Sequence, residues 1–246
     1  MDRTPARYAL AAALALSLCS AAGSRADQFS DFAKSMLQQP AAQSALSDAD
    51  IGAGLKQALA KGARSAINEL GRSDGFWGNP RFRIPLPGPV QQLESVLQTA
   101  GMGAQLDALQ LSFNRAAEQA VPVAADVFSQ AVQKLTLNDV RGILSGPQDA
   151  ATQYFKRATS DTLTARFKPI VAKVTARSGL AQQYNSVMAS AGPMSSMLGD
   201  KADLNSYVTQ KALDGLYLRV GDEEKAIRTD PAARSTDLLK KVFGSN

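Results

Sequence analysis

Residues 47–71 read SDADIGAGLKQALAKGARSAINELG and carry the sharpest helical pattern of the chain. Apolar or small residues recur there at every third or fourth position, which places them on one face of an amphipathic helix: Ile51, Leu55, Leu59, Gly62, Ala66 and Leu70. Ser47 or Asp48 can cap its start, and Gly71 can end it. Because a narrow apolar face must be buried against other helices, this stretch indicates an all-α fold.

The same spacing recurs along most of the chain and predicts one helix after another. We expect further helices over residues 90–100, 106–120, 122–135, 138–144, 148–177, 208–227 and 231–243. Asn138 can cap its helix, and Pro169 should kink or split the long one. The last helix starts after the Asp230–Pro231 pair and holds Leu238, Leu239, Val242 and Phe243. The prediction is a single all-α domain of about eight or nine helices.

The apolar face of the long helix is expected to hold Ala151, Tyr154, Phe155, Ala158, Leu163, Phe167, Ile170 and Val174. Residues 190–203 are small and polar, and we interpret them as a connection between helices.

Residues 73–89 cannot be helical, because they hold three Gly and four Pro. The same stretch concentrates large aromatic and basic side chains, namely Phe76, Trp77, Arg81, Phe82 and Arg83. Loops that carry aromatic side chains often bind a partner, so these five residues are candidate binding residues. The alternative is a rigid strap whose aromatic rings fill the helical core.

The N-terminus has the layout of a secretory signal peptide. Arg3 and Arg7 precede an apolar run over residues 8–18, and small residues follow it. Cleavage is expected after Ala26, with Ala22 as a second site. Residues 1–26 would then be the signal peptide, residues 27–46 a linker or loosely docked segment, and residues 47–246 the helical domain. We expect export to the periplasm.

The chain has no His and one Cys, which excludes catalysis by a Ser-His-Asp triad or a Cys-His pair, and a Cys/His zinc site. Cys19 leaves with the signal peptide if cleavage follows Ala26; the alternative is a lipid anchor on Cys19. The net charge of +5 is too small to predict nucleic-acid binding. No other segment is long and apolar enough to cross a bilayer. We expect no metal site and no cofactor.

Without His, any catalysis must rest on carboxylates, amides, hydroxyls or Arg and Lys side chains, and Glu118, Asp149 and Asp214 are the candidate catalytic residues. Glu118 shares a helix face with Asn114 and lies three residues from Arg115, which suggests either an acid–base site or a buried pair that ties two elements together. Asp214 precedes Gly215 inside an apolar run and is a candidate buried carboxylate. Its candidate partners are Arg115, Arg157 and Arg234.

Asp149 lies at the start of the long helix, where a carboxylate favours capping. Ligand binding there, with Thr152 and Tyr154, is the alternative. Residues 222–224, Asp-Glu-Glu, are typical of a solvated helix face.

Eight segments read together resemble DUF4197, a bacterial family of exported proteins of uncharacterised function. They are DGF (74–76), NP (79–80), IPLP (84–87), NRAAE (114–118), AVP (120–122), GPQDAATQYF (146–155), YVTQKALDGL (207–216) and DPAAR (230–234). The family often has Asn where this chain has Asp230, and either residue can cap a helix. The resemblance covers residues 50–244 and implies a mostly helical exported domain with no catalytic assignment.

Together these observations favour a non-enzymatic cell-envelope protein that binds a small or apolar ligand or a protein partner. The alternative is a carboxylate-dependent hydrolase that acts on an envelope polymer. That alternative requires two of the three carboxylates to converge within about 5–10 Å in an open cleft.

Overall fold

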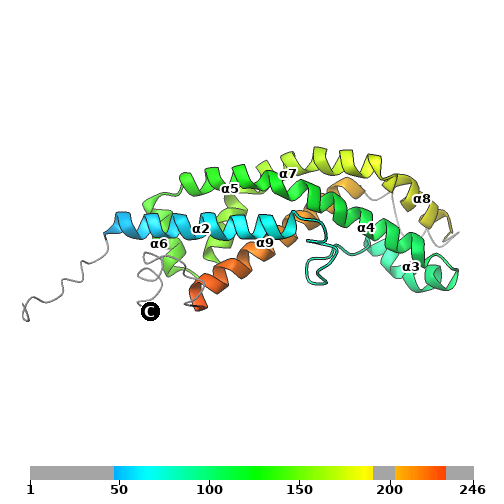
Figure 1. Ribbon diagram of the computed structural model, residues 1–246, viewed down its shortest axis with the longest axis horizontal. Helices are drawn as coiled ribbons and strands as arrows, with labels where there is room; N and C mark the ends of the chain where they lie inside the picture. Colours follow the sequence, from blue (N-terminus) through cyan, green and yellow to red (C-terminus); the bar gives the residue numbers. More distant parts are fainter. Residues whose placement is uncertain (1–46, 191–202, 231–246) are drawn as a thin grey trace, which may run out of the picture. The chain divides into compact units, whose positions relative to one another are not determined.

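A computed structural model describes residues 47–190 and 203–230, which are largely helical and contain no strand (Figure 1). The helices are α2 (Asp48–Leu70), α3 (Gly88–Thr99), α4 (Gly103–Ala120), α5 (Ala124–Gln133), α6 (Leu137–Ser145), α7 (Ala150–Arg177), α8 (Leu180–Ser190) and α9 (Leu204–Thr229), with a 3-10 turn η1 (Val121–Val123) after α4. The predicted all-α fold is confirmed. The predicted signal peptide, linker and last helix, with Cys19 and Arg234, lie outside the described residues.

Two capping boxes start helices where local sequence allows them. At α2, Ser47 Oγ accepts from the Asp50 amide and the Asp50 carboxylate accepts from the Ser47 amide, which confirms Ser47 as the cap. At α6, Thr136 and Asp139 form the same reciprocal pair. The expected cap Asn138 is wrong by two residues and lies inside the helix.

The long helix α7 is continuous, and Pro169 lies within it without splitting it. Apart from Ala150 at its start, its buried residues recur at every fourth position: Ala151, Phe155, Thr159, Leu163, Phe167, Val171 and Thr175. Four residues turn a helix by about 40° more than one full turn, so this buried line winds around α7. Helices α4, α5, α6, α8 and α9 all contact it. The predicted fixed apolar face is therefore only partly right, and Ala158 is exposed.

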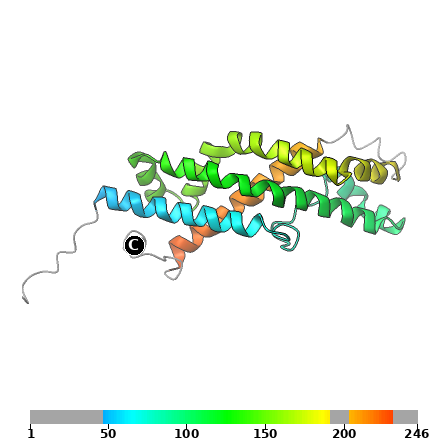
Figure 2. The ribbon, with the colours of Figure 1, turned by 45° about the horizontal axis from the view of Figure 1, so that its top comes forward.

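Helix α8 follows α7 through Gly179, whose φ of 65° lies in the left-handed region that favours glycine. This helix is absent from the sequence prediction. Helix α8 contacts α3 and α4 at one end of the helical domain, whereas α5 and α6 contact α2 (Figure 2).

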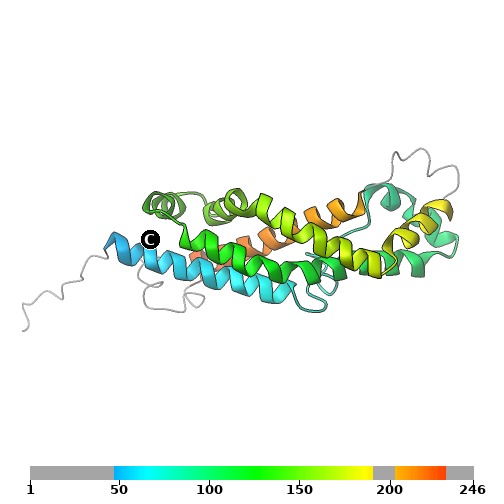
Figure 3. The same cartoon turned by 90° about the horizontal axis from the view of Figure 1, so that it is seen from above.

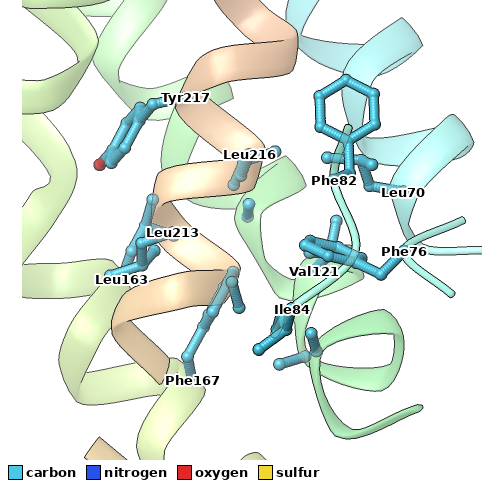
Figure 4. Close-up of a cluster of buried hydrophobic side chains, with 14 of the residues drawn as sticks. Leu70, Phe76, Phe82, Ile84, Val121, Leu163, Phe167, Leu213, Leu216 and Tyr217 are labelled. Carbon is cyan, nitrogen blue, oxygen red and sulfur yellow. The ribbon is translucent and has the colours of Figure 1, made fainter. Parts of the chain in front are cut away.

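Helix α9 is the central element, in contact with α2, α4 and α7 (Figure 3). Its buried residues are distributed around the helix: Val208, Thr209, Ala212, Leu213, Gly215, Leu216, Tyr217, Val220, Glu224 and Ile227. Leu213 lies beside Leu163 of α7 on one side of α9, whereas Leu216 lies on the side from which Phe76, Phe82 and Ile84 approach (Figure 4). Helix α9 thus connects α2, α4 and α7.

Candidate functional site: the strap and its groove

Residues 71–87, here called the strap, connect α2 to α3 without regular helix. Phe76, Phe82 and Ile84 point into the core from the strap (Figure 4) and are almost completely buried. Phe76 packs on α9 at Gly215, where a Cβ atom would lie 2.7 Å from Phe76 Cε1. The glycine inside α9 is therefore explained by close packing. For Phe76 and Phe82 the structure favours the core-filling alternative.

Two buried polar residues of α4 hold the strap's backbone. The side-chain amide of Asn114 accepts from the Ile84 amide at 2.8 Å and donates to the Ile84 carbonyl at 3.1 Å. Glu118 Oε1 accepts from the backbone amides of Phe76 and Trp77, both at 3.1 Å. Because these strap groups are buried or partly buried, each needs a partner inside the protein. Asn114 and Glu118 thus tie α4 to the strap, which matches the structural alternative for this pair.

Arg115 completes the attachment at the strap's first turn. Its guanidinium donates to Glu118 Oε2 and to Asp74 Oδ1, both at 2.7 Å, and to Ser73 Oγ at 3.1 Å. The hydrogen bond to Glu118 raises the pKa of Arg115 further above its ordinary value, with Asp74 adding to the effect. Asp74 has a φ of 63°, and its ion pair holds a backbone conformation that non-glycine residues rarely adopt.

The second half of the strap is fixed from α9 and by an internal stack. Tyr207 donates its hydroxyl to the Pro85 carbonyl at 2.9 Å. Arg83 Nε donates to the Trp77 carbonyl at 2.8 Å, and its guanidinium lies 4.5 Å from the centre of the half-buried Trp77 ring. A cation over an indole ring is a favourable pair. The strap is therefore preorganised, and Trp77 and Arg83 are half-buried in it.

A groove of about 570 Å³ lies between the strap and the second half of α9. We call it the strap groove; its lining residues are Glu69, Asn79, Arg81, Phe82, Arg219, Asp222, Lys225, Ala226, Thr229 and Asp230. The groove is wide open to solvent. Three of the six charged residues in the lining belong to α9, one comes from α2, one from the strap, and Asp230 directly follows α9.

The charges of the strap groove are largely paired. Arg81 makes a two-pronged ion pair with Asp222, at 2.5 and 2.7 Å. Arg219 Nε donates to Glu69 at 2.6 Å, and its other arm pairs with Glu223 outside the lining. Lys225 is exposed and has no ion-pair partner among the described residues. The groove therefore presents fixed charges of both signs beside one available ammonium group.

Asp214, predicted as a candidate buried carboxylate, is exposed on α9. It accepts from Gln210 at 3.0 Å and lies 3.9 Å from the Lys211 ammonium. The expectation of burial is wrong because Gly215, one residue on, faces Phe76 and turns Asp214 toward solvent. No contact joins it to Arg115 or Arg157 in the described structure.

Asp149 occupies the N-cap position of α7, but its side chain makes no capping hydrogen bond and accepts instead from Gln153. Glu224 of α9 takes that role. It accepts from the Ala151 and Thr152 amides at 3.0 and 2.9 Å and from the Thr152 hydroxyl at 2.8 Å. The expected capping by Asp149 is therefore wrong, and Thr152 is a partner of Glu224.

Glu224 is buried and pairs with Arg228, which also donates to the Ile143 carbonyl at 2.8 Å. The predicted solvated face over residues 222–224 is thus wrong: Asp222 binds Arg81, and Glu223 accepts from Ser65 at 2.7 Å. Val220 lies four residues before Glu224 and Ile227 three residues after it, and these apolar positions were the sequence signal that this face of α9 is covered.

Tyr154, the remaining predicted binding residue, donates its hydroxyl to the Ala131 carbonyl of α5 at 2.8 Å. Burial raises the pKa of its phenol. Glu118, Asp149 and Asp214 lie on separate elements, and no hydrogen bond links any two of them. The sequence pattern missed the α9 residues that line the strap groove, chiefly Arg219 and Lys225.

The described residues contain no group of three or more His, Cys, Asp or Glu that could hold a metal ion. None of the helices in the described ranges combines the length and the apolarity needed to cross a bilayer.

A family model described as "Protein of unknown function (DUF4197)" matches residues 45–244. No curated protein and no solved structure matches the chain. Several of the segments that carried the resemblance meet at the strap: DGF and IPLP lie in it, NRAAE binds it from α4, and YVTQKALDGL supplies Tyr207 and Gly215 from α9.

Proposed function

This chain belongs to the DUF4197 family, and we propose that it is an exported, non-enzymatic binding module whose ligand site is the strap groove. The observation that carries the proposal is the preorganisation of the strap. Buried Asn114 and Glu118 fix its backbone from inside, while Arg81 on its outer side extends into the groove. A site that is already ordered loses less conformational entropy on binding.

The groove's chemistry favours a charged ligand or a charged segment of a partner protein. Arg81 is about half exposed, so its ion pair with Asp222 is accessible at the groove's edge. Lys225 offers an ammonium group that is not already paired in the described structure, and Phe82 contributes an apolar wall. Arg and Trp side chains are common energetic centres of protein interfaces, and the half-buried pair of Trp77 and Arg83 lies on the same strap.

Binding is a better account than hydrolysis for the placement of the three candidate carboxylates. Glu118 is occupied by two strap amides and Arg115, whereas Asp149 and Asp214 are exposed and contact polar neighbours on their own helices. Hydrolysis by paired carboxylates needs two of them across one substrate bond. None of Glu118, Asp149 and Asp214 lines the strap groove, and this favours binding over the hydrolase alternative.

Export is supported by the N-terminal sequence. The basic start, the apolar run over residues 8–18 and the small residues before Asp27 have the order that secretory signals share. The proposed location is the periplasm, with cleavage after Ala26. A lipid anchor on Cys19 is the less favoured form.

Native mass spectrometry of protein purified from periplasmic extract tests both parts of the proposal. We expect a mature chain that starts at Asp27 and carries a co-purifying ligand or partner. The double variant Arg81→Ala/Lys225→Ala should lose that species, whereas Lys173→Ala/Arg177→Ala, which removes the same charge from exposed positions of α7, should keep it. Equal retention by both variants would refute the strap groove as the site. An acylated Cys19 at the N-terminus would refute cleavage at Ala26.

A further inference from the structure

A second, apolar groove lies between the start of α2 and α6, away from the residues of the strap groove. It measures about 260 Å³ and is lined by Asp48, Ile51, Leu137, Val140, Arg141, Leu144 and Ser145. Leu137 is 54% exposed, although it is a large apolar residue. The ion pair between Asp48 and Arg141 borders the groove. Apolar side chains inside a charged border are typical of a surface that another helix covers.

The face of α2 that borders this groove is the face that packs on α9. Glu69, Ser65 and Gly62 contact Arg219 and Glu223, and Ala58 packs with Ile227. Leu55 lies three residues before Ala58, and Ile51 lies four residues before Leu55, so both share the same face of α2. Helix α9 ends at Thr229, two residues after Ile227, which packs with Ala58, and so does not extend over Ile51.

The chain leaves α9 at this place. Arg228 in the last turn of α9 donates to the Ile143 carbonyl of α6. From Ala58 to Ile51 is seven residues of helix, or about 10 Å. The segment 231–246 that follows has 16 residues, and as a helix it would span roughly 24 Å. It is therefore long enough to reach the groove and to cover it.

The segment also has matching chemistry. Large apolar side chains occupy four of its positions, Leu238, Leu239, Val242 and Phe243, at the spacing of one helix face, with Lys240 and Lys241 between them. The family match extends through residue 244, so the segment belongs to the same domain as α2 and α6. We propose that the C-terminal segment 231–246 docks as a helix on the apolar groove between α2 and α6 and buries its apolar face against Ile51, Leu137 and Leu144.

Disulfide trapping in the full chain carrying Cys19→Ser tests the docking directly. The pair Leu144→Cys/Val242→Cys should close an intramolecular disulfide at least about tenfold faster than the control pair Ser186→Cys/Val242→Cys, in which the exposed Ser186 lies on α8. Non-reducing electrophoresis separates the products. Equal rates for the two pairs would overturn the proposal. A covalent dimer as the main product would assign the groove to a second copy of the chain and would also overturn it.

Alkylation of the single thiol that Leu144→Cys introduces into the Cys19→Ser chain gives a second readout with a matched control. We expect Leu239→Asp/Val242→Asp to raise the alkylation rate by about tenfold, because the apolar face no longer binds the groove. Lys240→Asp/Lys241→Asp places the same carboxylates on the other face of the predicted helix and should leave the rate within about twofold. Rates that rise equally in both variants would overturn the docking. Neither measurement depends on a ligand in the strap groove.

Discussion

At the scale of single residues, close packing explains the glycine that interrupts the apolar run of α9. Gly215 lies against the edge of the fully buried Phe76 ring, and a methyl group there would meet it at 2.7 Å. The ring cannot withdraw easily, because Phe76 donates its backbone amide to buried Glu118. One glycine therefore sets the distance between the strap and α9.

We predict that Gly215→Ala destabilises the protein by about 1–3 kcal/mol through overpacking, despite the better helix propensity of alanine. Urea unfolding followed by circular dichroism measures the effect. Gly142→Ala in α6 is the matched control, since a Cβ there meets nothing within 4 Å. It should stabilise the protein by up to about 1 kcal/mol. A Gly215 variant as stable as the control would contradict the packing role of this residue.

At the scale of elements, helix α7 depends on another helix for its N-terminal cap. The first amides of a helix lack partners within it, and here Glu224 of α9 accepts from two of them. A carboxylate at that end also complements the helix dipole. Arg228 balances the buried charge of Glu224 and reaches α6 as well. The ends of α6 and α7 are thereby attached to one turn of α9.

Glu224→Ala should therefore cost about 3–5 kcal/mol, because it removes the buried carboxylate that pairs with Arg228 and accepts from two helix amides. Asp149→Ala, at the position where sequence predicted the cap, should cost less than about 1 kcal/mol. Chemical denaturation gives both values, and hydrogen exchange at the Ala151 and Thr152 amides locates the effect. If the two substitutions cost the same, α7 is not capped from α9.

At the scale of the whole described domain, the strap connects elements that are far apart in sequence. It follows α2 directly, is bound by Asn114 and Glu118 of α4, and accepts a hydrogen bond from Tyr207 of α9. Its aromatic residues extend the core between these helices. Release of the strap would expose Phe76 and leave buried polar groups without partners, so the strap and the helices should unfold together.

Trp77 is the single tryptophan and reports on this coupling. We predict that its fluorescence transition in urea coincides with loss of helix measured by far-ultraviolet circular dichroism. In the folded protein, a soluble quencher should reduce the emission only in part, because the ring is half-buried and Arg83 covers one face. A fluorescence change that precedes the loss of helix would mean that the strap detaches independently.

The sequence by itself determined the all-α class and most of the helices. Their signals are local: an apolar residue every three or four positions, Ser47 before Asp50, and the Gly and Pro residues that exclude helix from the strap. Local signals act within one or two turns, so they can be read from neighbouring residues. The composition also limited the available chemistry, since a chain without His must rely on carboxylates, amides and cationic groups.

Only the tertiary structure decided what the polar residues do. Glu118 and Glu224 are both helical glutamates, yet Glu118 accepts hydrogen bonds from the strap and Glu224 caps the start of α7. Asp214, also on a helix, faces solvent. The strap groove likewise exists only because α9 brings Arg219 and Lys225 beside Arg81. The physical reason is that the burial of a polar group depends on which helix face meets which neighbour. That choice is made by packing between residues far apart in the chain, such as Ser65 and Glu223, which lie 158 positions apart.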